Sequence, residues 1–381
     1  MTAEGTLAFV AGEVSGDLLA AHALAALRAR APELRTAGIG GERMQAEGLE
    51  AWWSSERLAV NGYADVLARL PELLWIRSRL RRRLLADRPL AFVGVDAPDF
   101  NLRLERRLRQ AGIPVVHMVS PSIWAWRRER IELIREAVDH MLCVFPFEPA
   151  VYAGTGVRAT YIGHPLAEVI PLEPDAAAAR RRLGLPEQGL VLAVLPGSRR
   201  GEVSRLIEPF LAAAALLAGR KRVAAVVVPL AHPGLRDSVE LVASRHPGLA
   251  LHLVDGQSHA AMEACDLALV ASGTATLECA LFKRPMVIGY RLSALSYRMM
   301  AGRGYLPDIG LPNILAGERL VPELIQHDCA PQALADAASE LLDSPQRLQS
   351  LQERFLAMHH DLRRDTAALA AQAILDTAGW R

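Results

Sequence analysis

A short apolar run that ends in a turn and leads straight into a helix recurs in both halves of this chain, and it limits the fold more than any other feature. Such runs lie at residues 7–11, 91–95, 190–195 and 267–270, and each precedes a turn rich in Gly, Pro, Ser or Asp. Continuous apolar runs of this length are typical of parallel strands that are covered on both faces. Strands alternating with helices predict doubly wound α/β domains, which bind ligands at the carboxyl ends of their strands.

The length of 381 residues exceeds one typical domain, so we expect two. We assign residues 1–168 to a first Rossmann-like domain and residues 169–350 to a second. Residues 351–381 are helical in pattern and long enough to cross back to the first domain. The sequence leaves open whether they return to their own chain or to a partner's.

Composition predicts a large aliphatic core, and the cysteine pattern predicts a protein of a reducing compartment. Aromatic residues make up 5% of the chain, and the 43 Lys plus Arg nearly balance the 42 Asp plus Glu. The four cysteines show no C-x-x-C spacing, which argues against disulfides and a cysteine-bound metal. The N-terminus lacks a basic stretch and no apolar run is long enough to span a bilayer, so we expect a cytoplasmic protein or one on a cytoplasmic membrane face.

In the second half, the turn at residues 272–274 is suited to a diphosphate. Gly273 allows a positive φ, Ser272 or Thr274 can cap the following helix, and a helix start offers free N–H groups. Glu278 lies about one turn into the helix, where a carboxylate can accept hydrogen bonds from a ribose. An ordinary capped turn is the alternative.

Two further polar residues of the second half are candidates. Arg199 follows the strand at 190–195 and can contact a phosphate with two N–H groups; a surface arginine is the alternative. Asn313, in the loop at 310–317, can hydrogen-bond a ligand or simply cap the turn.

In the first half, the first turn reads G-E-V-S-G-D and carries Glu13 where a dinucleotide site has bare backbone. Glu13 suits a hydroxyl or a proton better than a pyrophosphate, although Glu13 or Asp17 could merely cap the helix. Asp96 ends the strand at 91–95, and we expect Pro98 to hold Ala97 extended and Asp96 rigid, as a general base requires. We expect Asp99 to cap the helix at 100–111.

The loop at 119–127 carries Trp124 and Trp126, which suit packing against a sugar ring or an acyl chain. An aromatic plug on the domain core is the alternative.

A basic helix is expected between residues 61 and 85. It has an apolar stripe (Leu73, Ile76, Leu80, Leu84), arginines that include Arg77 and Arg81, and Trp75 nearby. Residues 69–135 contain 15 Arg against 7 acidic residues. This pattern indicates binding to an anionic membrane surface. A core helix with a solvated arginine face is the alternative, and nucleic-acid binding is disfavoured because no nucleic-acid motif accompanies the charge.

Six motifs occur in order: AGEVSGD at 11–17, VGVDAPDFN at 93–101, VSPSIWAWR at 119–127, LPGSR at 195–199, ASGTATLE at 271–278 and LPNILAG at 311–317. Together they resemble the bacterial lipid-A-disaccharide synthases, which are glycosyltransferases of the GT-B fold with two Rossmann-like domains facing across a cleft. The resemblance implies the donor UDP-2,3-diacylglucosamine and the acceptor 2,3-diacylglucosamine 1-phosphate (lipid X). It also implies inversion at the donor carbon, a β(1→6) linkage, no cofactor or metal, and work at the inner-membrane surface.

On this hypothesis, Asp96 is the base, with Glu13 second, and Arg199 and the 272–274 turn stabilise the leaving UDP. Ser198 joins the UDP site, Glu278 holds the ribose, and Asn313 contacts donor or acceptor. Acceptor or lipid contacts are expected from Ser15, Trp124, Trp126 and Arg127. Two rival interpretations are a UDP-sugar 2-epimerase or other lipid-linked glycosyltransferase on the same fold, and a non-catalytic nucleotide-sugar or lipid-binding protein at the membrane. A homodimer is possible; a nucleic-acid partner is not expected.

Overall fold

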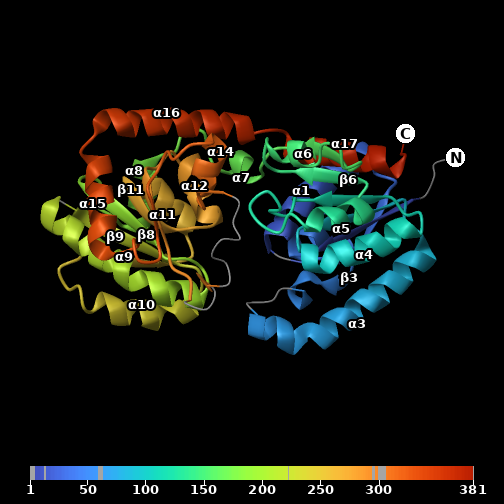
Figure 1. The fold of residues 1–381 in the computed structure, drawn as a ribbon, viewed down its shortest axis with the longest axis horizontal. Coiled ribbons are helices and arrows are strands. Elements are labelled where there is room, and N and C mark those ends of the chain that lie inside the picture. Colours follow the sequence, from blue (N-terminus) through green and yellow to red (C-terminus); the bar gives the residue numbers. More distant parts are fainter. Residues whose placement is uncertain are drawn as a thin grey trace. The chain divides into compact units, whose positions relative to one another are not determined.

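The computed structural model divides the chain into two compact units (Figure 1). The first comprises Met1–Pro165 together with Leu362–Arg381, and the second comprises Leu166–Asp361. The structure describes residues 5–12, 14–58, 63–221, 223–293, 297–298 and 306–380, without the side chains of Val14 and residues 63–68. Glu13 lies outside the described residues.

The described residues of the first unit form a seven-stranded parallel sheet. Its strands are β1 (Thr6–Ala11), β2 (Arg35–Gly40), β3 (Glu50–Ser54), β4 (Ala91–Val95), β5 (Val115–Met118), β6 (His140–Cys143) and β7 (Arg158–Tyr161). Their order is β3-β2-β1-β4-β5-β6-β7. The order reverses between β1 and β4, which pair in parallel with Leu7 opposite Ala91. The turns after β1 and β4 therefore lie at the switch point where such sheets bind ligands.

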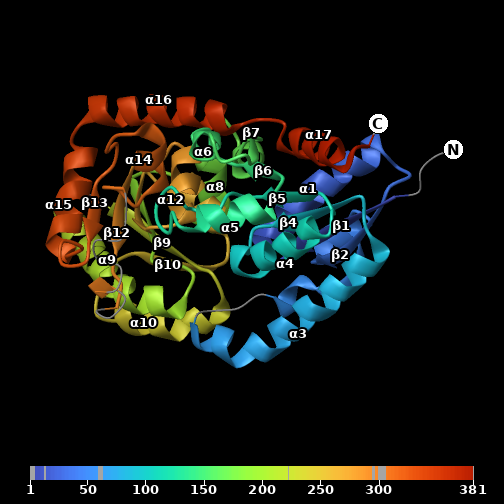
Figure 2. The same ribbon diagram turned by 45° about the vertical axis from the view of Figure 1, so that its right-hand side comes forward.

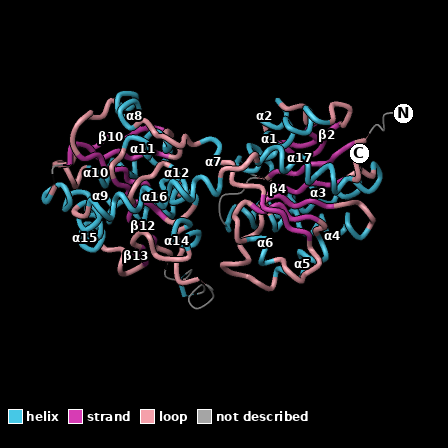
Figure 3. The backbone as a smooth tube through the Cα atoms, turned by 90° about the horizontal axis from the view of Figure 1, so that it is seen from above, coloured by secondary structure: helices cyan, strands magenta, loops and turns pink. Residues whose placement is uncertain are grey.

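Helices cover both faces of this sheet (Figure 3). They are α1 (Val14–Arg30), α2 (Glu42–Ala46), α3 (Tyr63–Asp87), α4 (Pro98–Gln110), α5 (Arg130–Ala137), α6 (Glu148–Val151) and α17 (Thr366–Ala378). One face is covered by α1 and α17, with Leu24 and Ile374 buried in the same core. The opposite face is covered by α3 and α4, through Ile76, Leu80 and Leu108. Because helices cover both faces of the sheet, its strands are apolar along their whole length.

The second unit repeats the plan with six strands. They are β8 (Leu190–Leu195), β9 (Val223–Leu230), β10 (Leu251–Asp255), β11 (Leu267–Ala271), β12 (Met286–Tyr290) and β13 (Glu323–Ile325), in the order β10-β9-β8-β11-β12-β13. The order again reverses once, between the parallel neighbours β8 and β11. The turns that follow these two strands carry Arg199 and Gly273, so both lie at the switch point of this sheet.

The helices of the second unit are α7 (Leu166–Val169), α8 (Ala176–Leu183), α9 (Arg200–Arg220), α10 (Arg236–Ala243), α11 (Ser258–Ala264), α12 (Thr274–Leu281), α14 (Leu311–Ala316), α15 (Pro331–Leu342) and α16 (Pro345–Leu362). None of the helices in the described residues has the length and hydropathy needed to cross a bilayer. Both units have the Rossmann-like architecture that the alternating pattern predicted.

The unit boundaries differ from the predicted ones. The boundary drawn after residue 168 falls inside α7, which packs against α12 and belongs to the second unit. The return to the first unit starts at Leu362 rather than 351, because α16 stays with the second unit up to Asp361. The returning helix is α17, which lies beside α1 of the same chain (Figure 2).

Candidate active site

Asp96 follows β4 with a left-handed backbone, φ 51°, and Ala97 follows with φ 45°. The expectation that Pro98 would hold Ala97 extended is therefore wrong. This backbone is unfavourable for residues other than glycine, and neighbouring groups hold it in place. The Asn101 side chain donates to the Asp96 carbonyl at 2.8 Å, and the Asp96 N–H donates to the Met118 carbonyl at 2.9 Å. The position of Asp96 is thus set by α4 and β5 rather than by the proline.

A pocket of about 350 Å³ opens beside Asp96. Its lining includes three residues with positive φ: Asp96, Val119 at 74° and Arg127 at 56°. With Ala97, these are four of the eight non-glycine residues of positive φ in the described part of the chain. Trp126 also lines the pocket, with the Arg127 guanidinium 4.1 Å from its ring centroid. Strained backbone gathers at functional sites, so the predicted group of Asp96, Trp126 and Arg127 forms a candidate site.

Asp99 does not cap α4. The N-cap of α4 is Ala97, with no side-chain cap hydrogen bond. Asp99 instead forms an ion pair with Arg130 at 2.7 Å, and both residues line the same pocket. The left-handed Ala97 starts the helix early, and this places Asp99 in its first turn, where its charge suits the helix dipole.

The two tryptophans of the 119–127 loop have different roles. Trp126 is exposed, whereas Trp124 packs edge-on against Phe147 at 5.1 Å and Phe145 at 6.3 Å. The Trp124 N–H donates to the Glu148 carboxylate at 3.1 Å. Burial raises the pKa of Glu148 to about 7. These contacts favour the alternative, an aromatic plug, and Trp124 does not line the Asp96 pocket; contact with an acceptor or lipid stays a prediction.

The first turn of α1 is only partly described. Ser15 is exposed there. Asp17 does not cap α1: its carboxylate accepts from the N–H groups of Gly41, Arg43 and Met44 at 2.7, 3.2 and 3.3 Å and so caps α2.

In the second unit, the β11–α12 turn has the predicted glycine. Gly273 has φ 147°, and nothing lies within 4 Å of the place where a side chain would begin. The capping prediction is wrong, because Gly273 itself is the N-cap without a side-chain cap bond. The Ser272 hydroxyl donates to the Ile309 carbonyl at 3.0 Å. The turn therefore keeps the first N–H groups of α12 free of side-chain partners and leaves room for a ligand.

Glu278 points to a histidine that the sequence did not suggest. Its carboxylate lies 3.1 Å from His259 Nε2. His259 lies in α11 and packs edge-on against Phe282. His259 and Glu278 come from consecutive helices on either side of β11, and their contact depends on the packing of α11 against α12 rather than on a local spacing.

Arg199 is the N-cap of α9, and its side chain is 73% exposed. Its one ion pair among the described residues is with Glu202, at 3.3 Å. Gly197 has φ 109°, and a side chain there would begin 2.7 Å from Glu202 Oε2. Ser198 is exposed beside Arg199. The turn thus presents a guanidinium with free N–H groups to solvent at a strand's carboxyl end.

Asn313 is buried and used inside the second unit. Its amide group donates to the Val321 carbonyl at 2.9 Å and to Glu323 at 2.8 Å, and its oxygen accepts from the Val321 N–H at 3.0 Å. These contacts favour the alternative, a residue that holds its loop; ligand contact stays a prediction.

The apolar stripe predicted to enter a membrane faces the core instead. Ile76, Leu80 and Leu84 are fully buried against the sheet, and Leu73 is half-buried. Trp75, Leu70 and Leu74 of the same helix are exposed. Arg77 is half-buried and Arg81 is exposed. The membrane hypothesis therefore rests on Leu70, Leu74, Trp75 and the arginines.

A family model described as "Lipid-A-disaccharide synthetase" matches residues 7–374. This chain belongs to the lipid-A-disaccharide synthase family. Among its relatives, the lipid-A-disaccharide synthase of Burkholderia vietnamiensis is 53% identical over 370 residues, which are 97% of this chain and 95% of that protein. The one of Aromatoleum aromaticum is 54% identical over 371 residues, again 97% and 95%. The resemblance inferred from six motifs is confirmed, and the chain is a glycosyltransferase.

Solved structures agree with the fold of a synthase of this family. Anabaena HepE in complex with UDP and glucose aligns with a TM-score of 0.58 at 14% identity, covering 98% of this chain and 99% of that one. An epimerase structure from Listeria monocytogenes, described as a putative UDP-N-acetylglucosamine 2-epimerase, aligns with a TM-score of 0.64 at 11% identity, covering 98% and 95%. At these identities the likeness shows the GT-B type of fold alone.

A buried histidine–glutamate pair close to Asp96 in this synthase was not predicted from the sequence. His117 and Glu105 are fully buried and lie 2.7 Å apart. His117 is opposite Gly94 in the β4–β5 register, and any side chain at Gly94 would collide with Glu105 Oε1. Burial opposes a charge on His117, but Glu105 and then Asp96 raise its pKa above the usual value. The sequence offered one sign of this pair: His117 interrupts an apolar strand, and Glu105 falls on the apolar face of a helix.

Proposed function

We propose that the chain joins UDP-2,3-diacylglucosamine to 2,3-diacylglucosamine 1-phosphate and releases UDP with inversion at the donor carbon. Family membership supports the reaction class. The observation that best supports the proposed chemistry is the position of Asp96. It is held rigidly at a strained switch-point turn, on the wall of the pocket lined by Trp126 and Arg127.

Inversion in one step requires a base that takes the acceptor hydroxyl proton while the oxygen attacks the anomeric carbon. Asp96 performs this role, because a half-buried carboxylate of fixed position can accept a proton at short range. Trp126 and Arg127 border the acceptor. Glu13 stays the second candidate for the base, and Ser15 stays a predicted acceptor contact.

The bond to UDP breaks as the new bond forms, and the leaving diphosphate gains negative charge. Arg199, with Ser198 beside it, and the start of α12 at Ser272, Gly273 and Thr274 neutralise that charge. Glu278, oriented by His259, accepts hydrogen bonds from the ribose. Within the described residues, no group of three or more His, Cys, Asp or Glu side chains gathers in a metal-binding arrangement.

On this proposal, the enzyme meets its lipid substrates at the cytoplasmic face of the inner membrane. The exposed Leu70, Leu74 and Trp75 of α3, next to its arginines, support peripheral attachment. A homodimer stays a prediction.

The deciding experiment measures UDP release from UDP-2,3-diacylglucosamine in detergent with EDTA, with and without lipid X. Release that needs lipid X and persists in EDTA supports a metal-independent disaccharide synthase. Release without acceptor indicates a hydrolase or an epimerase. Bound UDP without any release indicates a binding protein.

A further inference from the structure

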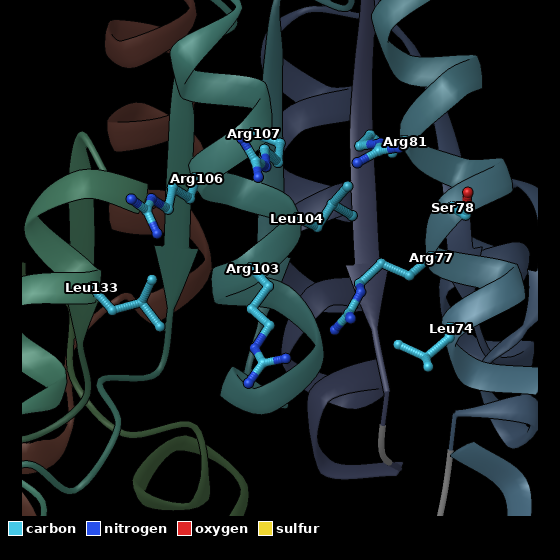
Figure 4. Close-up of a pocket in the computed structure, with 9 residues that line it drawn as sticks. All are labelled: Leu74, Arg77, Ser78, Arg81, Arg103, Leu104, Arg106, Arg107 and Leu133. Atoms are coloured by element: carbon cyan, nitrogen blue, oxygen red, sulfur yellow. The ribbon is translucent and has the colours of Figure 1, made fainter. Parts of the chain in front are cut away.

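Positive charge gathers in a groove between α3 and α4. The groove has a volume of about 550 Å³, and its lining includes five arginines: Arg77, Arg81, Arg103, Arg106 and Arg107. Figure 4 shows Arg77 and Arg81 extending from α3 toward α4, which carries the other three. We call this the arginine groove. Arg103, Arg106 and Arg107 were not among the predicted site residues.

Most of this charge has no counter-charge in the described part of the chain. Arg106 pairs with Glu136 at 2.6 Å. Among the described residues, Arg107 donates to the neutral Gln110 at 3.3 Å, and Arg77 donates to a backbone carbonyl at 3.5 Å and lies 5.9 Å from the Phe100 ring centroid. No ion pair is found for Arg77, Arg81, Arg103 or Arg107 among the described residues.

The spacing makes the arrangement unfavourable in the absence of an anion. Arg77 and Arg81 are four residues apart on α3, as are Arg103 and Arg107 on α4. Like charges at this spacing destabilise a helix. Burial, and then the charges of Arg103 and Arg81, lower the pKa of Arg77. A bound anion that touches both helices would relieve this repulsion.

Two arginines elsewhere on α3, Arg83 and Arg79, have partners, whereas Arg82 has no ion pair among the described residues. Arg83 pairs with Asp87 at 3.4 Å and lies 3.8 Å from the ring centroid of Trp52. Arg79 lies over the Trp75 ring at 5.2 Å. Among the described residues, four arginines without an ion pair gather in the groove, and Arg82 is a single such residue on the rest of this stretch of α3.

We propose that the arginine groove binds the phosphomonoester headgroup of a lipid. A phosphomonoester carries a charge of about −1.5 to −2 at neutral pH and offers three acceptor oxygens, so it matches several guanidinium groups better than a singly charged phosphodiester. The lipid source is indicated by Leu74, which lines the groove and is 45% exposed, and by the exposed Trp75 beside it. The inference rests on the proposed lipid-surface attachment and specifies the headgroup.

The test compares binding to two kinds of vesicle by sedimentation, above the second phosphate pKa of about 6. Both contain phosphatidylcholine and one anionic lipid, either phosphatidic acid or phosphatidylglycerol. The amount of anionic lipid is chosen so that the two kinds of vesicle have the same surface potential. Wild-type protein should prefer phosphatidic acid by about fivefold, the equivalent of one further charge interaction of about 1 kcal/mol. Arg81→Gln with Arg103→Gln should abolish that preference.

The matched control is Arg79→Gln with Arg82→Gln, which removes the same charge from α3 outside the groove. It should weaken binding to both vesicles alike and keep the preference. The groove variant should unfold at the same temperature as wild type or above it, because it relieves repulsion.

Three outcomes overturn the proposal. In the first, wild-type protein binds phosphatidic acid and phosphatidylglycerol vesicles equally well. In the second, both double variants lose the preference for phosphatidic acid to the same extent. The third is inorganic phosphate that raises the melting temperature of wild type but not of the groove variant, without any vesicle preference, which would make the groove a site for free phosphate. In each case, acceptor-dependent UDP release in detergent still tests the proposed reaction separately.

Discussion

At the residue scale, Asp96 illustrates how a functional group can depend on an unfavourable backbone. Its positive φ is tolerated by Asp and Asn better than by most residues. The pattern of the strand and turn identified Asp96, but the reason for its rigidity differs from the predicted one. Asn101 and Met118 hold it, and these contacts join three separate elements.

Asp96→Asn should lower turnover by about 10²–10⁴-fold, the usual contribution of a general base, while UDP affinity stays nearly unchanged. Asparagine tolerates the left-handed backbone, so a loss of turnover would come from removal of the carboxylate that accepts the proton. The measurement is UDP release under saturating substrates, together with UDP binding by calorimetry. Asp99→Asn, in the same pocket, is the control and should keep most of the activity. Near-normal turnover in Asp96→Asn would exclude Asp96 as the base.

Arg199→Ala should weaken UDP binding by about 10- to 100-fold, which corresponds to one charge-assisted hydrogen bond of about 1.5–3 kcal/mol. Its side chain is 73% exposed, and its partner Glu202 keeps the hydrogen bond from the backbone N–H of residue 199 in the variant. Titration calorimetry with UDP measures the effect. Arg200→Ala, the exposed neighbour, should bind UDP as wild type does. Equal UDP affinities for Arg199→Ala and wild type would refute the assignment.

At the element scale, α3 shows what periodicity can and cannot tell. The spacing of Leu73, Ile76, Leu80 and Leu84 correctly indicated a helix, but the same stripe could face a core or a membrane. Packing against β1, β2 and β4 assigns it to the core. What remains exposed is Leu70, Leu74 and Trp75, and only burial in the tertiary structure distinguishes the two sets.

His140 gives the docking of α17 a pH dependence. Its ring nitrogens lie 3.0 Å from Thr377 Oγ1 and 2.8 Å from Thr160 Oγ1, joining β6 to α17 and β7. Burial lowers its pKa from the usual value to about 4. Between pH 6.5 and 4 the unfolded chain therefore binds a proton that the folded chain does not, and stability is lost as pH falls through this range.

His140→Gln should reduce this loss by on the order of 1 kcal/mol after allowance for solvent screening, or about 2–4 °C in melting temperature. The measurement is the wild-type minus variant difference in melting temperature at pH 7 and pH 4.5. The difference cancels His164, whose pKa burial also lowers to about 4, and Glu148, whose raised pKa acts in the opposite direction. A difference that does not change with pH would contradict the assignment.

At the scale of the whole molecule, the end of the chain belongs to the unit that begins it. Ile374 of α17 is fully buried in the core of α1, β1 and β4. Ile374→Ala should destabilise the first unit by about 2–5 kcal/mol, whereas Leu369→Ala, exposed on the same helix, should change stability by about 0.5 kcal/mol or less. Hydrogen exchange should accelerate in β1 and β4 and stay unchanged in β8 and β11. Faster exchange in β8 would contradict this division.

The sequence by itself determined the architecture, the family and the placing of Asp96, Arg199 and Gly273 at the ends of strands. It could do so because strand, turn and helix signals are local, and because parallel strands place their carboxyl ends at one edge. The tertiary structure alone decided which side chains meet: Glu278 with His259, Trp124 with Glu148, Glu105 with His117, and the two arginine pairs of the groove. Such contacts join side chains of different elements, and they depend on close packing of those elements, which no local pattern encodes.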